Sequence, residues 1–163
     1  MRTAGGAVGR LCILGGSAIM LSAAAPASPQ PAPTGKDGTA RIHVTVTDLR
    51  NARGVVRACM THDPRAFPKC RGVAGAHAAT VDAREGSVTF TFDRVKPGRY
   101  AIALLHDENG NNRADRALGM MPREGFGFSR DAKVRMGPPR FDEAMFEVRE
   151  NERRLAIHMR YML

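Results

Sequence analysis

The stretch YAIALLHDENGNNRAD, residues 100–115, decides how this chain folds. Its first six residues are all apolar, which predicts a strand that is buried on both faces. The residues that follow are mostly acids, amides and glycine, at a density that no hydrophobic core could use. We therefore predict that a central strand delivers His106 and Asp107 to the edge of a sheet.

Shorter apolar segments surround this strand. Val88, Phe90 and Phe92 alternate with polar residues, which is the pattern of a half-buried strand, and the other expected strands are residues 42–46, 54–60, 74–83, 141–148 and 155–161. Gly, Pro and Asn separate them, and no segment has a convincing amphipathic helical pattern. About seven short strands predict an all-β, antiparallel two-sheet β-sandwich. The segment VKPGRY, residues 95–100, resembles the turn and tyrosine of prealbumin-like and immunoglobulin-like modules, a likeness of fold that does not fix function.

The N-terminal segment has the organisation of a secretory signal peptide. Arg2 and Arg10 precede or flank an apolar run at residues 11–21, and small residues follow it. We expect a signal peptide at residues 1–27, a flexible Pro/Ala-rich lead-in at 28–38 and a single β-sandwich domain at 39–163. The apolar run is too short to span a bilayer, so we expect an exported protein, periplasmic or extracellular, with no transmembrane segment after signal removal.

The composition limits the classes of partner. The formal net charge of +9 falls by two when Arg2 and Arg10 leave with the signal peptide, and the remaining Arg and Lys residues are scattered. Because the chain has no basic run and few aromatic residues to stack on bases, it is not expected to bind nucleic acid. Its partner is expected to be an unknown ligand or a component of the cell envelope.

Two cysteines, Cys59 and Cys70, remain in the chain after export. In an oxidising compartment such a pair predicts a disulfide. A redox role would favour the Cys-x-x-Cys spacing, which this pair lacks, so the bond is expected to be structural.

The polar half of the central stretch has the spacing of a calcium-binding loop. Asp107, Asn109, Asn111 and Asp115 fall at its positions 1, 3, 5 and 9, and the carbonyl of Arg113 falls at position 7. We name residues 107–115 the Asx loop.

Two positions of the twelve-residue calcium-loop pattern, which runs from Asp107 to Leu118, are not matched. Asn112 stands where glycine makes the sharp turn, and Leu118 stands where a glutamate closes the ligand shell. Asn tolerates the left-handed conformation, so the first departure is mild. The second requires a carboxylate from elsewhere, and Glu108, Glu124 and Asp131 are the nearest in sequence. The alternative is a turn whose Asn and Asp side chains bond their own backbone and bind nothing.

The segment GFGFS, residues 125–129, is expected to belong to a long loop. Its two rings, Phe126 and Phe128, could anchor that loop on an apolar surface. Alternatively, they could form a ligand surface together with His106.

These residues resemble a known family. The segment HDENGN at 106–111, Asp115, the segment EGFGFS at 124–129, Pro138-Pro139 and Phe141 are similar to a family of secreted bacterial proteins known only as domain of unknown function 2141. The resemblance covers about residues 42–163. Glycine would be expected at Asn112, and a single aliphatic residue at Met120-Met121. The resemblance implies export and the extent of the domain, and it implies no reaction.

Three functions are consistent with these features. The first is a nonenzymatic binding or scaffold module in which calcium orders the Asx loop, so that Asp107→Ala would cost calcium-dependent stability and leave the calcium-free protein nearly unchanged. The second is a metal-dependent hydrolase, with His106-Asp107 and His62-Asp63 at one end of the sandwich and Glu124 as general base. The third is a copper-handling protein that uses His106 with Met120-Met121.

Overall fold

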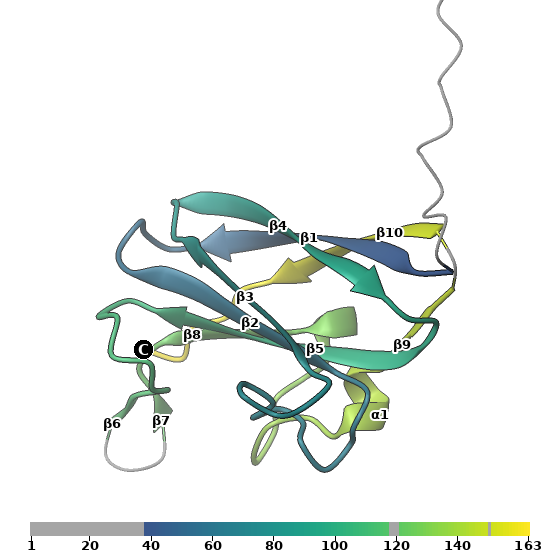
Figure 1. Cartoon of the computed structure of the whole chain (residues 1–163). Coiled ribbons are helices and arrows are strands. Elements are labelled where there is room, and N and C mark those ends of the chain that lie inside the picture. The colour runs from purple at the N-terminus through teal and green to yellow at the C-terminus, as the bar shows by residue number, and fades with distance from the viewer. Residues whose placement is uncertain (1–37, 118–120, 150) are drawn as a thin grey trace, which may run out of the picture. The chain divides into compact units, whose positions relative to one another are not determined.

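The structure is a computed structural model that describes residues 38–117, 121–149 and 151–163. The predicted signal peptide and nearly all of the lead-in lie outside these residues. The described part contains two β-sheets that pack face to face (Figure 1). The prediction of a two-sheet β-sandwich is therefore confirmed.

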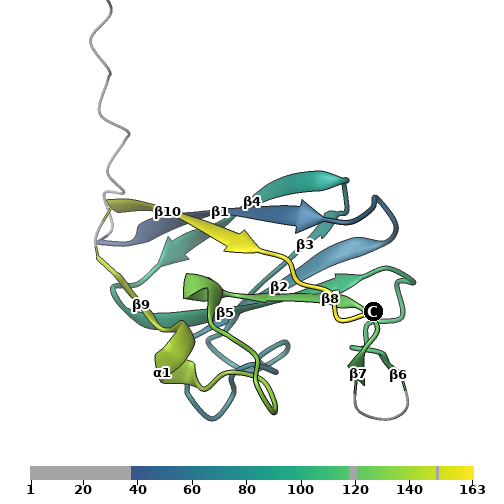
Figure 2. The same ribbon diagram turned by 180° about the vertical axis from the view of Figure 1, so that it is seen from behind.

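The first sheet has three strands in the order β10-β1-β4, formed by β1 (Ala40–Leu49), β4 (Gly86–Val95) and β10 (Asn151–His158). β1 runs antiparallel to β4, but it is parallel to β10. An entirely antiparallel sandwich was thus the wrong expectation for this pair. β10 is reached from β9 (Phe146–Val148), which pairs with the first residues of β5 in the other sheet, so the chain crosses between sheets before β10 begins (Figure 2).

The second sheet has the order β3-β2-β5-β8 and contains β2 (Val55–Thr61), β3 (His77–Asp82), β5 (Gly98–Asp107) and β8 (Gly125–Phe128). The predicted central strand is β5, which has a hydrogen-bonded neighbour on each side. A separate hairpin of β6 (Arg116–Ala117) and β7 (Met121–Pro122) follows it.

β5 is buried on both faces, as its continuous apolar run predicts. Tyr100, Ile102 and Leu104 face the core between the two sheets. Ala101 lies on the other face, where a smaller cluster that includes Phe67, Phe128 and Phe141 covers the sheet. Alanine suits this outer face because its small side chain leaves room for three aromatic rings.

Two segments differ from their predicted structure. GFGF, residues 125–128, was expected to be loop and is the edge strand β8, with its phenylalanines on the outer face and its glycines on the inner face. A Cβ at Gly125 would lie 2.4 Å from the Tyr161 ring, and one at Gly127 would lie 3.1 Å from the His158 carbonyl oxygen. The alternation therefore puts glycines on the inner face, where neighbouring atoms come too close for a side chain, and phenylalanines on the outer face, where they pack in the smaller cluster.

The predicted strand at residues 141–148 is instead one helical turn, α1 (Phe141–Ala144), followed by β9. The Glu143 carboxylate accepts the Arg140 backbone N–H at 2.7 Å, which caps the first turn. Phe141 and Ala144, three residues apart, both reach the outer cluster, and this is helical spacing. A short 3-10 helix, η1 (Ser129–Asp131), packs beside this turn.

Cys59 and Cys70 form a disulfide whose Cα atoms lie 5.8 Å apart, as their pairing in the sequence predicts. The bond ties the end of β2 to the loop that leads to β3. None of the helices in the described ranges has the length and apolar character needed to cross a membrane.

Candidate functional site

The C-terminal end of β5 gathers buried polar side chains, beginning with His106. His106 is fully buried, and both ring nitrogens have partners: Nε2 lies 2.8 Å from the Arg53 carbonyl oxygen and Nδ1 lies 2.7 Å from the Tyr161 hydroxyl. A carbonyl can only accept, so Nε2 carries a proton, and in the neutral ring Nδ1 then accepts a hydrogen bond from the Tyr161 hydroxyl. The same hydroxyl oxygen accepts the Arg50 backbone N–H at 3.2 Å. The ring thus links three distant segments.

Glu108 holds the loop between β1 and β2 against the end of β5. Its carboxylate accepts two hydrogen bonds from the Arg50 guanidinium, at 2.7 and 2.9 Å, and further bonds from Asn51 and Arg53. The hydrogen bond from Arg50 is the main reason why the pKa of Glu108 falls to about 2, against the opposing effect of burial. Glu108 is therefore an ionised carboxylate that fixes this loop, and both of its oxygens already accept hydrogen bonds.

Asp107 lies between these two residues and is fully buried. Its Oδ2 accepts a hydrogen bond from Arg57 Nε at 2.5 Å and one from the Asn112 backbone N–H at 2.9 Å, while Oδ1 accepts the Asn111 N–H at 3.0 Å. Burial alone would raise the pKa of Asp107, but these donors outweigh it and lower the pKa.

This position of Asp107 corrects one expectation. Asp107→Ala would leave the Arg57 guanidinium without its partner in a largely buried place, so the calcium-free protein would be destabilised rather than nearly unchanged.

The Asx loop curls through hydrogen bonds between its own residues. Asn109 Oδ1 accepts the Asn111 N–H, Asn111 Oδ1 accepts the Arg113 N–H, and both Asn side chains donate to Asp115. Asn112 has φ 65°, the left-handed conformation that the sixth position of a calcium loop requires. The loop therefore has the side-chain to backbone hydrogen bonds of Asx turns, and at Asn112 its backbone has the conformation found in a calcium loop.

Glu124 supplies a further carboxylate beside the Asx loop. It is only 4% exposed, and its Oε2 accepts the Asp115 backbone N–H at 3.1 Å. Its Oε1 is buried and has no hydrogen-bond partner in the described part of the chain. The pKa of Glu124 is raised chiefly by burial and also by the charges of Asp107 and Asp115. The hydrogen bond from the Asp115 N–H acts in the opposite direction, as does the nearby Glu108 N–H, which lies outside hydrogen-bond geometry.

The His, Cys, Asp and Glu side chains of the described residues do not by themselves form a metal site. Within residues 38–117, 121–149 and 151–163, no three His, Cys, Asp or Glu side chains converge so that they could hold a metal ion. Any cation here would need amide and carbonyl oxygens of the Asx loop as well as carboxylates, which is the ligand set of calcium and not of zinc or copper.

The arrangement that the hydrolase hypothesis requires is absent. His62 packs edge-on against Tyr100 at the first residues of β5, whereas His106 lies near its last residue. Six residues of strand separate the two positions by about 20 Å. His62-Asp63 and His106-Asp107 therefore do not meet, and that expectation was wrong.

The proposed copper ligands are only partly visible. Met120 and the side chain of Met121 lie outside the described residues, while both nitrogens of His106 are hydrogen-bonded. The proposed ligand surface is also largely covered, since His106 is fully buried, Phe128 is 8% exposed and Phe126 is half-buried. Burial of this kind fits the anchoring interpretation of the two rings.

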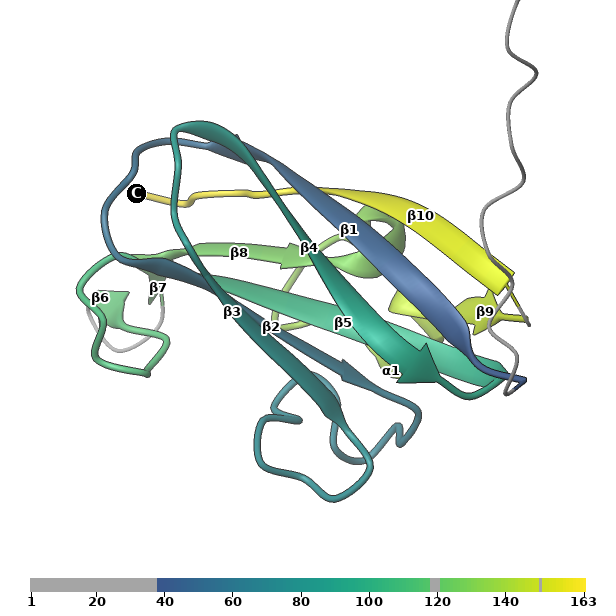
Figure 3. The same ribbon diagram turned by 45° about the horizontal axis from the view of Figure 1, so that its top comes forward.

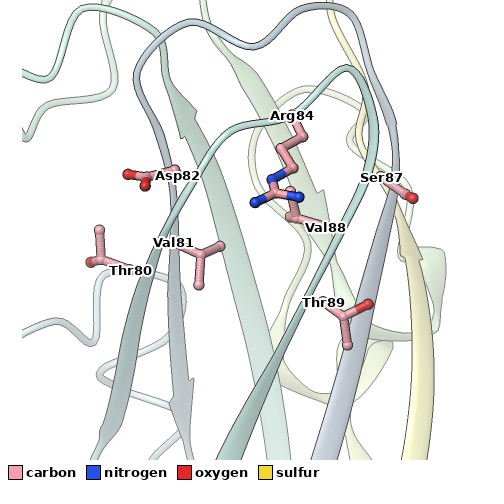
Figure 4. A pocket seen from close by; sticks show the side chains of 7 residues that line it. All are labelled: Thr80, Val81, Asp82, Arg84, Ser87, Val88 and Thr89. Atoms are coloured by element: carbon pink, nitrogen blue, oxygen red, sulfur yellow. The ribbon is translucent and has the colours of Figure 1, made fainter.

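A hollow of about 590 Å³ lies between β3 and β4. In Figure 4 the Arg84 guanidinium lies between the two strands, while Asp82 points away from it. The other residues that line this hollow are Thr80, Val81, Ser87, Val88 and Thr89.

The sequence did not identify the residues that hold the polar end of β5 together. Arg50, Arg53 and Arg57 lie about fifty residues before their acidic partners, and Tyr161 lies fifty-five residues after His106. Gly54 was also missed, although it has φ 65° and a Cβ there would lie 2.0 Å from the Asp107 carbonyl oxygen. The one signal in the sequence that could have found these contacts is the presence of three arginines within residues 50–57, which would suggest acidic partners in another part of the chain.

The comparisons with known proteins identify a family for which no activity is described. No curated protein and no solved structure matches the chain. Residues 44–156 match a family described as "Uncharacterized protein conserved in bacteria (DUF2141)", which confirms the resemblance seen at HDENGN and EGFGFS. That match spans most of the chain and nearly all of both sheets, and the chain therefore belongs to the DUF2141 family.

Proposed function

We propose that this protein is an exported, nonenzymatic binding or scaffold module in which one calcium ion joins the Asx loop to Glu124. The observation that carries the proposal is the buried Glu124 Oε1, which has no hydrogen-bond partner in the described part of the chain and lies on a residue that already contacts Asp115. A buried carboxylate oxygen without a partner is costly, and a cation would offset that cost.

The balance of charge supports a divalent cation. Arg57 pairs with Asp107, and Arg50 pairs with Glu108. Asp115 and Glu124 have no ion pair with any described residue. Two uncompensated carboxylates, together with amide oxygens of Asn109 and Asn111 and the carbonyl of Arg113, make a hard, oxygen-only ligand set.

Calcium would serve structure in this proposal. It would join the segment after β5 to the strand that begins at Gly125, and so hold the β6-β7 hairpin in one orientation for a ligand or envelope component. This role needs no reacting group, which agrees with a His106 whose two ring nitrogens are both engaged.

The test is thermal unfolding of the disulfide-intact protein in chelator and in millimolar calcium, with Glu124→Gln as the variant. A hundredfold excess of calcium over its Kd should stabilise the parent by about 2.7 kcal/mol. Glu124→Gln should lose this gain, and in chelator it should be no less stable than the parent, because it removes a buried charge that Asp107 and Asp115 repel.

Glu85→Gln, a change at an exposed position in the turn before β4, is the matched control and should keep the full calcium response. Equal midpoints for the parent with calcium and with chelator would refute the calcium site. An equal rise with magnesium or zinc would refute its selectivity.

A further inference from the structure

A second hollow, of about 330 Å³, lies at the opposite end of β5 from the Asx loop. It forms where β3 begins, β4 ends and β5 begins, beside the seam along which β3 and β4 diverge into different sheets (Figure 3). Its polar lining is almost entirely cationic or titratable: His62, His77, Arg94, Lys96 and Tyr100.

Among the residues that the structure describes, no acidic side chain lines this pocket. Arg94 and Lys96 also form no ion pair with any residue in the described ranges. Burial, followed by repulsion from His62, lowers the pKa of His77. Arg94 and Lys96 therefore give the pocket a positive charge that no side chain in the described part of the chain compensates.

A β-bulge places Arg94 at this pocket. The register of β4 against β1 shifts between Phe92 and Val95, so that one extra residue is inserted. Without it, Arg94 would follow the inward alternation of Val88, Phe90 and Phe92; with it, Val95 is fully buried and Arg94 is exposed. Arg94 has φ 53°, a left-handed conformation that is unfavourable for arginine.

The two imidazoles are held in place by packing. The ring centroids of His62 and His77 lie 6.0 and 6.2 Å from that of Tyr100, both edge-on. The Cys59–Cys70 disulfide constrains the loop that carries His62. A pocket whose donors are fixed before binding loses little conformational entropy when a ligand enters.

We propose that this pocket binds a phosphate-type oxyanion. The two permanent cations, two imidazoles and one phenol offer more hydrogen-bond donors than the two oxygens of one carboxylate can accept. They suit a dianion with several oxygens. The volume accommodates a phosphate group with a small attached body. The phosphate is either a free ion or the terminal group of a larger molecule such as a phospholipid.

The test follows the ring signals of His62 and His77 by NMR while inorganic phosphate is added to the full-length chain at constant ionic strength. Saturable shifts are expected with phosphate and not with acetate. Arg94→Gln with Lys96→Gln should weaken phosphate binding at least tenfold, because each charged donor contributes an energy near that of a tenfold change. Lys133→Gln with Arg135→Gln, which removes two exposed cations outside the pocket, should leave binding unchanged.

Vesicles that contain phosphatidic acid, compared with purely zwitterionic vesicles, form the second arm. Binding of phosphatidic acid vesicles that is lost in the Arg94/Lys96 variant would assign the site to a lipid phosphate, and saturation by phosphate alone would assign it to the free ion. The proposal is overturned if neither probe binds, if acetate binds as well as phosphate, or if the control pair weakens binding equally.

Arg94→Gly separates binding from folding. Glycine adopts φ 53° without strain, so the unfolding midpoint should be at least that of the parent while phosphate affinity falls. A variant that keeps the parent's affinity would show that Arg94 does not contact the anion.

Discussion

Substitution of Gly54 by alanine should separate the β1–β2 loop from the end of β5. A Cβ at this position would lie 2.0 Å from the Asp107 carbonyl oxygen and 2.8 Å from the Glu108 Cα, and both are backbone atoms that cannot rotate away. The φ of 65° adds about 1 kcal/mol of strain for any residue with a Cβ. Displacement of a packed backbone adds roughly 1–3 kcal/mol, so we expect a total loss of about 3 kcal/mol.

Gly86→Ala is the matched control for this prediction. Gly86 has φ 85°, and a Cβ there would meet nothing within 4 Å, so the substitution carries the strain without the clash and should cost about 1 kcal/mol. Urea unfolding of both variants at pH 7 measures the difference, which should be about 2 kcal/mol. Equal losses would show that the close approach of Gly54 to Asp107 does not hold this end of the sandwich together.

Two further predictions concern the same buried network. Tyr161→Phe keeps the ring but removes the hydroxyl that donates to His106 and accepts from Arg50, so urea unfolding should show a loss of about 1–2 kcal/mol; an unchanged free energy of unfolding would mean that water replaces the hydroxyl. Glu108→Gln should destabilise by about 2 kcal/mol at pH 7, since it removes the charge that Arg50 and Arg53 contact. Because folding lowers the pKa of Glu108 from 4.5 to about 2, its contribution is complete above pH 4.5 and is lost as the pH falls towards 2. The parent and Glu108→Gln should therefore converge in stability at low pH, and a constant difference from pH 7 to pH 3 would contradict this assignment.

Part of the candidate site was predictable because its signal is local. The spacing of Asp107, Asn109, Asn111 and Asp115 predicted a curled loop, and Asn112 takes the left-handed conformation that this spacing requires. The sequence also included Glu124 among the nearest carboxylates. It could not show that one oxygen of Glu124 is buried without a partner, because that depends on how β8 docks against β5.

A local sequence pattern was ambiguous where it fits two kinds of secondary structure equally well. Residues 141–148 contain apolar positions that fit both a strand and a helical turn, and the bond between Glu143 and Arg140 decides for the turn. GFGF has the composition of a loop, yet it forms a strand because it pairs with β5. Its first glycine is needed because Tyr161 and Met159 pass so close that a Cβ does not fit there.

The sequence by itself determined the two-sheet sandwich, the central strand β5 and the pairing of Cys59 with Cys70, because alternation of apolar residues and cysteine spacing act over short distances along the chain. Only the tertiary structure decided that β10 lies parallel to β1 and that His106 and Glu108 are bound by Tyr161 and Arg50. These contacts join residues more than fifty positions apart. Their energy depends on burial and on the distance between charges, and neither quantity exists until the two sheets have packed.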